Sequence, residues 1–395
     1  MARFLNKHRL HKGSSCFAMQ KFMSGRYVNQ GTYKSFQPEK INRLWKIEDM
    51  ELLNLLSQAD RQLGRLDMYS EYIPNIDLFI SMHVLKEATQ SSRIEGTKTN
   101  IEEALLSKED ISEEKRDDWE EVQNYISALN KAVLQLEELP FSSRLIRQTH
   151  AVLLSGVRGK HRLPGEFRSS QNWIGGASIS DAIFIPPIHT SIGEYMSDLE
   201  KFVHNQELLL PDLLKIALVH YQFETVHPFL DGNGRVGRLM ITLYLVEKKI
   251  LKKPILYLSD YFERNRSLYY DNLMRVREKH DITQWFKFFL VGIIETAKSS
   301  ISTFDQILKL QQKVDGVVQA LGSRANNANT IVKHLYQHPV VDAQEAKRLT
   351  NLSLPSVYKL LGELEKHHII QGMTGAKRGR VFYFKEYIDL FSSDK

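Results

Sequence analysis

The segment that most constrains the fold is ETVHPFLDGNGRVGRL, residues 224–239, which places three glycines between two helix-like stretches. Apolar residues recur three and four positions apart on both sides of it. The glycines satisfy the G-x-G-x-x-G spacing of dinucleotide-binding proteins, but that turn follows a strand, whereas this one follows a helical pattern. The sequence therefore predicts a glycine-rich turn between two helices.

Two further explanations of this segment are weaker. A calcium-binding loop needs a regular acidic series and a closing glutamate, but Arg235 interrupts the series and Thr242 stands at the closing position. A plain turn, with His227 bonded to a backbone carbonyl, would not require Arg235 and Arg238 three positions apart on the next helix. The plain turn stays open as the structural alternative.

The residue types of the segment fit a phosphate site. Gly232, Asn233 and Gly234 can turn their backbone N–H groups toward one point, at the positive N-terminal end of the second helix. Arg235 and Arg238 add charge-assisted donors for other phosphate oxygens. The sequence therefore predicts a nest for a phosphate chain.

Two side chains at the mouth of the turn carry groups that can take part in a reaction. Asp231 supplies a hard carboxylate, which suits Mg²⁺ bridging two phosphates. His227 is of the side-chain type that titrates near neutrality, so it can accept the proton of an attacking hydroxyl. A general base beside a phosphate chain is the expected arrangement.

The stretch HPFLDGNGRVGR, residues 227–238, resembles the signature H-x-F-x-[DE]-G-N-G-R-x-x-R of Fic-domain proteins at every specified position. The resemblance implies a mainly α fold that transfers AMP from ATP to a Ser, Thr or Tyr hydroxyl of a protein, releasing pyrophosphate, with Mg²⁺ as cofactor. It implies that His227 is the base and that Asp231 holds the metal. It also implies that Asn233 contacts the α-phosphate and that both arginines contact the distal phosphates. The implied nucleotide-binding residues are Gly232, Asn233, Gly234, Arg235 and Arg238.

Residues 165–188 resemble the flap of the same family, a β-hairpin that binds the backbone of the target protein beside the motif. β-Prone residues around Trp173 and Phe184 flank a glycine pair there. Main-chain pairing would explain tolerance of different target side chains. The implied docking residues are Ile174, Gly175, Gly176, Phe184, Ile185 and Pro186.

Ser91, Glu95 and Gly96 lie in ATQSSRIEGTKTN, which resembles the inhibitory motif [ST]-x-x-x-E-[GN] of the family. The resemblance implies that Glu95 pairs with Arg238, occupies the donor that should hold the γ-phosphate, and repels the ATP tail. ATP would then bind only unproductively. A solvated acid at a helix end is the alternative.

Helical spacing dominates the chain, so the sequence predicts a mainly α protein with a β-hairpin flap. The first 36 residues are rich in Ser, Gly, His and basic residues and contain no acid, and their seven Lys and Arg exceed the net charge of +6 for the whole chain. The expected parts are a disordered basic leader at 1–36, a helical region with the inhibitory helix at 37–140, a Fic catalytic core at 141–321, a linker at 322–329 and a winged-helix domain at 330–395. The core is expected to end in two helices, at 283–300 and 303–321.

The last part resembles a winged helix, with three helices followed by two strands that meet at a basic tip. Residues 330–395 contain ten Lys and Arg against seven Asp and Glu, a small surplus. Winged helices also dock proteins, so DNA binding and protein binding both stay open. The expected DNA contacts are Ser356, Tyr358 and Lys359 near the start of the third helix and Lys377, Arg378 and Arg380 on the wing.

Composition narrows the class of protein. The single cysteine, Cys16, excludes an internal disulfide and a cysteine-based zinc site, so a reducing, cytoplasmic location is the simplest expectation. No stretch approaches the roughly 18 uninterrupted apolar residues of a membrane span, and no membrane partner is expected.

The favoured interpretation is an autoinhibited, Mg²⁺-dependent protein adenylyltransferase that modifies a hydroxyl of a target protein and of itself. One alternative is a DNA-binding regulator whose Fic body senses nucleotide without turnover, although the intact His227 favours chemistry. Another is a Fic enzyme that uses a different phosphate-containing donor or removes AMP. A homodimer is expected from family analogy alone.

Overall fold

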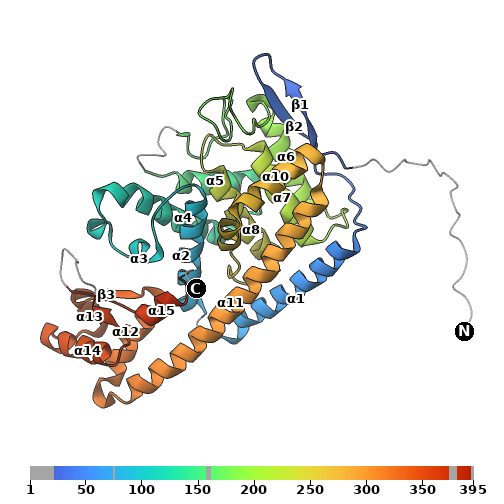
Figure 1. Cartoon of the computed structure of the whole chain (residues 1–395). Coiled ribbons are helices and arrows are strands. Elements are labelled where there is room, and N and C mark those ends of the chain that lie inside the picture. Colours follow the sequence, from blue (N-terminus) through green and yellow to red (C-terminus); the bar gives the residue numbers. More distant parts are fainter. Residues whose placement is uncertain (1–21, 74–75, 157–161, 373–379, 393–395) are drawn as a thin grey trace, which may run out of the picture.

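The computed structural model describes residues 22–73, 76–156, 162–372 and 380–392. They form a mainly helical protein with two small antiparallel sheets. Figure 1 shows the sheet near the N-terminus at one end of the molecule and the C-terminal elements at the other, with the longest helix between them. The mainly α class predicted from the helical spacing is therefore confirmed.

A buried helix, α7 (Asp212–Val226), lies at the centre of the helical body, and its side chains are buried from Leu213 to Val226. A helix buried on every side must be surrounded by other elements. The helices α6 (Ile192–His204), α8 (Asn233–Glu247) and α11 (Ile282–Gln319) pack against it. The glycine-rich turn between α7 and α8 is therefore anchored in the core at both ends.

A second group of helices surrounds α8. The helix α8 contacts α2 (Asp77–Ile94), α4 (Arg116–Gln135) and α5 (Ser143–Leu153). Short helices complete this body: α3 (Ile101–Ala104), α9 (Ser259–Arg264), α10 (Arg266–Lys279), and the 3₁₀ turns Lys108–Asp110, Glu113–Lys115 and His189–Ser191. Because α2 contacts α8 directly, residues near position 91 can reach the nucleotide motif.

The longest helix, α11, is continuous where the sequence predicted two helices at 283–300 and 303–321. That prediction is wrong because Ile301, Phe304 and Ile307 continue the buried stripe of the helix through the Ser- and Thr-rich run. Apolar burial outweighs the weak helix propensity of those residues. The helix α1 (Met50–Tyr72) runs alongside α11 (Figure 1).

The N-terminal sheet is a hairpin of β1 (Gly25–Asn29) and β2 (Lys34–Pro38). The expectation of a disordered leader through residue 36 is therefore wrong for these residues, and 1–21 lie outside the described residues. The reason is tertiary burial: Phe36 is fully buried, its ring lies 5.8 Å from that of Phe184, and its N–H donates to the Ile185 carbonyl at 2.8 Å. The buried Phe36 thus orders a segment whose composition predicts disorder.

The C-terminal elements are α12 (Ala325–Gln337), α13 (Ala343–Thr350), α14 (Leu354–Lys366) and α15 (Lys385–Asp389), with a sheet of β3 (Val340–Asp342), β5 (Val381–Tyr383) and β4 (Gln371–Gly372) in that order. The linker expected at 322–329 is wrong, since a 3₁₀ turn at Gly322–Arg324 leads directly into α12. The fully buried Ala328 shows that this helix packs from its first turn. The winged-helix assignment stays a prediction.

In the described ranges, no helix combines the length and the apolar character that a membrane span needs.

Candidate nucleotide-binding and catalytic site

The turn between α7 and α8 is held by its own side chains. His227 ends α7 in the left-handed region with φ 49°, and Gly232 precedes α8 with φ 74°. The Asn233 amide accepts from the Phe229 N–H and donates to the Phe229 carbonyl, both at 2.8 Å. The Asn233 side chain thus closes the loop, while its Nδ2 carries a second N–H beyond the one given to Phe229. The contact of Asn233 with the α-phosphate stays a prediction.

His227 is neutral in this environment. Burial, followed by the positive charges of Arg168 and Arg277, lowers the pKa of His227 to about 3, against the opposing effect of Glu95. Its Nδ1 atom is buried and has no hydrogen-bond partner among the described residues. A neutral imidazole is the form that accepts a proton.

Asp231 and Arg235 form the outer part of the turn. The Asp231 side chain is about half exposed, and its carboxylate accepts from the Gly232 N–H at 2.6 Å. Arg235 is almost fully buried, and its Nη1 atom donates to Glu121 on α4 at 3.0 Å, while Nη2 lies 3.7 Å from Asp231. The structure thus gives Arg235 an acidic partner that the sequence did not reveal.

Arg238 is bound by the end of α2. Its Nε donates to the Ser91 hydroxyl and its Nη2 to the Ser91 carbonyl, each at 2.9 Å, and Nη2 also donates to the Glu95 carboxylate at 2.6 Å. The guanidinium side chain is 1 % exposed, and the Glu95 side chain is 35 % exposed. Arg238 is therefore enclosed in protein, while its acidic partner reaches solvent.

The charges of this pair stabilise each other. Burial raises the pKa of the Glu95 carboxyl, but Arg238 outweighs burial and holds that pKa below its usual value. Burial opposes the charge of Arg238, yet Glu95 raises the pKa of the guanidinium above its usual value. The two groups are thus an ion pair at neutral pH, as required if one is to block the other.

Gly234 allows Glu95 to lie directly against the phosphate nest. A Cβ atom added at Gly234 would stand 2.2 Å from the Glu95 carboxylate and 2.9 Å from the Arg238 guanidinium. The carboxylate therefore lies over the first turn of α8, where backbone N–H groups attract anions. Gly96 follows with φ 104°, a conformation that favours glycine and ends the helical run.

The flap is less regular than the expected hairpin. Ile174 and Phe184 form an isolated antiparallel bridge, with the Ile174 N–H donating to the Phe184 carbonyl at 2.8 Å. Gly175 and Gly176 have φ of 69° and 76° and turn the chain tightly beside Ile183 and Asp181. The two-strand hairpin is therefore replaced by one bridge and a turn, since Asp181 accepts from the backbone N–H groups of 177 and 178 instead of extending the ladder.

The base of the flap is packed from two directions. The Arg277 guanidinium lies 3.8 Å from the centre of the Phe184 ring, and Phe36 packs on the same ring. Ile185 and Pro186 follow Phe184 in the same segment, and the Ile185 carbonyl is bound by β2. The flap therefore rests on both the helical body and the N-terminal hairpin.

Sequence reasoning missed four buried residues around the turn: His150, Arg168, Glu224 and Arg277. His150 stacks on Phe229 with ring centroids 3.7 Å apart, accepts from the Gly165 N–H at Nδ1, and lies with Nε2 3.0 Å from the Asp231 carbonyl. Burial raises the pKa of Glu224 to about 7, although Arg238 and Arg277 act in the opposite direction. No local spacing pattern marks His150, Arg168 or Arg277. Glu224 opens the segment 224–239, but only the structure shows that its carboxyl is buried there.

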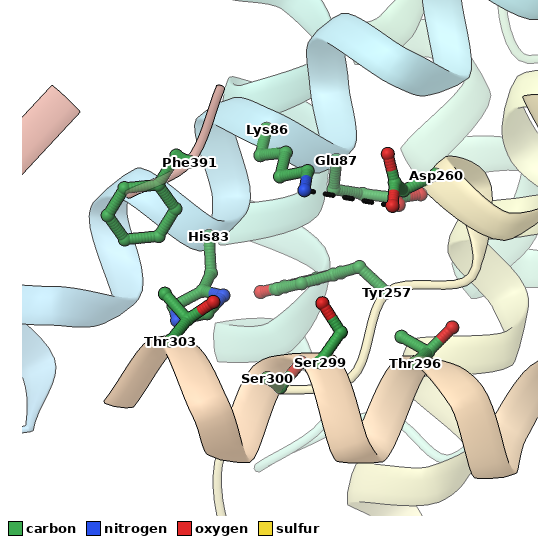
Figure 2. A pocket seen from close by; sticks show the side chains of 10 residues that line it. All are labelled: His83, Lys86, Glu87, Tyr257, Asp260, Thr296, Ser299, Ser300, Thr303 and Phe391. Atoms are coloured by element: carbon green, nitrogen blue, oxygen red, sulfur yellow. Dashed lines mark ion pairs between the residues drawn. The ribbon is translucent and has the colours of Figure 1, made fainter. Parts of the chain in front are cut away.

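A separate cavity lies along the middle of α2, between α2 and α11 (Figure 2). It measures about 450 Å³ including its opening to solvent, and Phe391 from the C-terminal end lies beside His83 at its edge. An ion pair between Lys86 and Asp260 spans 3.7 Å on one wall. This cavity contains none of the residues of the nucleotide motif.

The residues expected to contact DNA are only partly described. Ser356, Tyr358 and Lys359 are exposed on α14. Arg380 is bound to Glu365 at 2.7 and 2.8 Å, so its charge is paired within the protein. Lys377 and Arg378 lie outside the described residues. The structure thus presents an exposed helix start there, and DNA contact stays a prediction.

Family models match both parts of the helical body. Residues 53–134 match the N-terminal region of the Fic/DOC family, and residues 140–245 match the Fic/DOC family domain itself. The chain therefore contains an N-terminal region and a domain of the Fic/DOC family.

The relatives give this class a more particular description. A probable protein adenylyltransferase of Aquifex aeolicus is 23 % identical over 244 residues, which are 60 % of this chain and 70 % of that protein. The protein adenylyltransferase Fic of Aedes aegypti is 30 % identical over 125 residues, which are 31 % of this chain and 22 % of that protein. The match therefore spans less than a quarter of the insect relative.

Solved structures share the fold. A Fic family protein from Desulfovibrio desulfuricans aligns over 87 % of this chain and 98 % of its own, with a TM-score of 0.55 and 19 % identity. Fic-1 from Caenorhabditis elegans aligns over 66 % of this chain and 75 % of its own, with a TM-score of 0.51 and 19 % identity. The Fic helical fold is thus shared over most of the chain.

Proposed function

We propose that the chain is a protein adenylyltransferase that moves AMP from ATP to a hydroxyl side chain of a protein, including itself. The observation that carries the proposal is the turn that places a neutral His227 and Asp231 before the N-terminus of α8, whose first two turns carry Arg235 and Arg238. Relatives that bear the name protein adenylyltransferase support the same chemistry.

In the proposed reaction, His227 Nε2 takes the proton of the target hydroxyl as its oxygen attacks the α-phosphorus. The bond from that phosphorus to the bridging oxygen breaks, and pyrophosphate leaves. The backbone N–H groups at the start of α8 and the charge of Arg238 stabilise the phosphate chain. Preorganised positive charge would contribute much of the rate enhancement.

Asp231 is the residue that would hold Mg²⁺. Its half-exposed carboxylate stands at the mouth of the turn, and the described residues contain no cluster of three acidic, His or Cys side chains around it. A single protein carboxylate fits this ion, which is usually bound through one or two carboxylates together with phosphates and waters. When bound, the metal would neutralise charge on the phosphates.

We further propose that Glu95 is an inhibitory residue. It occupies the Arg238 donor that would bind the γ-phosphate, and its negative charge lies over the nest where the phosphate chain must enter. Breaking a buried ion pair is costly unless a new anion replaces the old one, and a phosphate is such an anion. Removal of Glu95 should therefore favour productive binding of ATP.

The test is incubation with ATP and Mg²⁺ followed by mass spectrometry of the intact chain. The Glu95→Gly variant should gain AMP faster than the native chain, by roughly 5- to 150-fold for a coupling of about 1–3 kcal/mol. Glu95→Gly combined with His227→Ala should gain none. A different mass adduct would indicate that another group of ATP is transferred, and loss of AMP from a modified protein would indicate removal of AMP.

A second candidate function is DNA binding through the C-terminal elements. The exposed start of α14, with Ser356, Tyr358 and Lys359, favours it. Binding of the full chain to duplex DNA should weaken as salt rises and should weaken further in Lys359→Ala. The proposal also includes a protein target with a hydroxyl side chain and a homodimer. It further includes a cytoplasmic location, which rests on the single cysteine.

A further inference from the structure

Arg168 is a buried cation bound by carbonyl oxygens. Arg168 is 2 % exposed. Among the described residues, its side chain has carbonyl acceptors and no carboxylate partner. Burial lowers the pKa of Arg168 to about 10, so the guanidinium remains charged at neutral pH. Such a group is costly to bury unless its donors are satisfied.

The acceptors of Arg168 belong to two different segments. Nε donates to the His227 carbonyl at 3.0 Å, and Nη2 lies 3.4 Å from the Val226 carbonyl. Nη1 donates to the Ser170 carbonyl at 3.0 Å, and Nη2 also donates to the Pro187 carbonyl at 2.6 Å. The first two carbonyls end α7, and the last two stand at the two ends of the flap.

We propose that Arg168 is a positioning residue that fixes the flap relative to His227, so that a hydroxyl docked on the flap meets the base. This inference rests on the proposed function. A planar guanidinium can reach several carbonyls in fixed directions, whereas an ammonium group cannot. The carbonyls at the end of α7 lack partners within their helix, so they are free to accept.

The backbone of the same residue strengthens the link. The Arg168 N–H donates to the Pro228 carbonyl at 2.9 Å, directly after the catalytic turn begins. The Asn172 amide makes a second, smaller connection, because its Nδ2 donates to the Phe229 carbonyl at 2.9 Å. The flap is thus tied to the turn from 226 to 229 by two side chains and one backbone bond.

The test uses the full chain in the Glu95→Gly background with the variant Arg168→Lys, which keeps the charge and loses the fork. The maximal rate of self-modification should fall about 10- to 100-fold, because small misplacement of reacting groups carries losses of that size. The KM for ATP should change less than about twofold, because the phosphate nest keeps its own contacts. Amide hydrogen exchange at Ile174 and Phe184 should become at least about tenfold faster.

Two further variants keep the test decisive. Asn172→Ala removes the smaller connection and should lower the rate about 3- to 10-fold, which keeps the inference testable if Arg168→Lys does not fold. Arg147→Lys is the matched control, because Arg147 donates to the Gly165 carbonyl at 2.7 Å, at the first residue of the flap, and makes no hydrogen bond to the 226–229 turn. It should leave the rate and the exchange unchanged.

The outcomes separate this inference from the proposed function. Unchanged rate and exchange in both Arg168→Lys and Asn172→Ala would overturn the positioning role while adenylyl transfer stands. A rise in the KM for ATP that matches the fall in rate would also overturn it, because general structural damage would then be the cause. If no variant transfers AMP, the proposed function fails, and the exchange data still report on the flap.

Discussion

The two halves of α2 contact the rest of the molecule in different ways. At the C-terminal end, Ser91 and the capping Glu95 accept three hydrogen bonds from Arg238 of the nucleotide motif. In the N-terminal half, Phe79 lies 5.3 Å from the Tyr336 ring and His83 lies 4.9 Å from the Phe391 ring, both of the C-terminal elements. One end therefore makes charged contacts, and the other makes aromatic packing contacts.

This difference separates contacts that a ligand could replace from contacts that no ligand could replace. A phosphate can replace a carboxylate on a guanidinium, because both are planar or tetrahedral arrays of anionic oxygens that the same donors bind. An aromatic ring in a packed core has no such substitute. We therefore expect the C-terminal end of α2 to control activity and the N-terminal half to control stability.

Glu87 and Glu95 show the same contrast within one residue type. Glu87 accepts from the Tyr125 hydroxyl at 2.8 Å and from the Ser259 hydroxyl and N–H at 2.6 and 3.2 Å, inside the core. Burial raises the pKa of Glu87 above its usual value in spite of these donors. The side chain of Glu95 instead reaches solvent and is bound mainly by one arginine. We therefore expect a fixed acid and a displaceable acid two helical turns apart.

The largest effect on stability is expected from Phe391→Ala. Removing a buried aromatic ring should lower the free energy of unfolding by about 3–5 kcal/mol, measured by denaturant titration. Self-modification per folded molecule should stay at the native level, because Ser91 lies about 12 Å further along the helix from His83. A rate close to that of Glu95→Gly would show that the two halves of α2 act together.

Glu87→Gln is expected to have the next largest effect. With its oxygen kept toward the Ser259 N–H, the amide would turn its NH2 group toward the Tyr125 and Ser259 hydroxyls, which would have to stop donating to residue 87 and accept from it instead. The free energy of unfolding should fall by about 1–3 kcal/mol, while the inhibition remains. Activation without loss of stability would place Glu87 in the inhibitory contact and would end the contrast with Glu95.

Ser91→Ala tests the inhibitory end with a smaller change. The variant removes the hydroxyl that accepts from Arg238 Nε and leaves the Ser91 carbonyl and Glu95 in place. Self-modification should rise roughly fivefold, as expected for the loss of about 1 kcal/mol, and should stay below that of Glu95→Gly. Ser92→Ala is the control, since the Ser92 hydroxyl has no partner among the described residues. A fall in rate would mean that Ser91 orients Arg238 for the nucleotide.

Local chemistry made the turn between α7 and α8 predictable from the sequence. Helical spacing on both sides and three close glycines define a turn, and the residue types within it point to phosphate. The contact of Glu95 with Arg238 was expected only through the family resemblance, because 143 positions separate the two residues. Without that resemblance, a lone glutamate at a helix end carries no signal.

Contacts between distant segments were the part that sequence patterns could not supply. Arg235 pairs with Glu121, which is 114 positions away, and Arg168 binds carbonyls that any residue could provide. Phe36 orders the β1–β2 hairpin only because Phe184 and Ile185 lie beside it. Composition and periodicity describe a residue by its chain neighbours, whereas these residues are placed by tertiary contacts.

The smallest effect is expected from Thr296→Val in the cavity beside α2. The Thr296 hydroxyl is buried on α11 and has no hydrogen-bond partner among the described residues. Valine has nearly the same shape and no polar atom, so the free energy of unfolding should rise by about 0.5–1 kcal/mol, measured by denaturant titration. Ser299→Ala, at a hydroxyl on the same wall of the cavity, is the comparison. Destabilisation by Thr296→Val would mean that water in the cavity satisfies the hydroxyl, and the N-terminal half of α2 would then be stabilised by hydration as well as by packing.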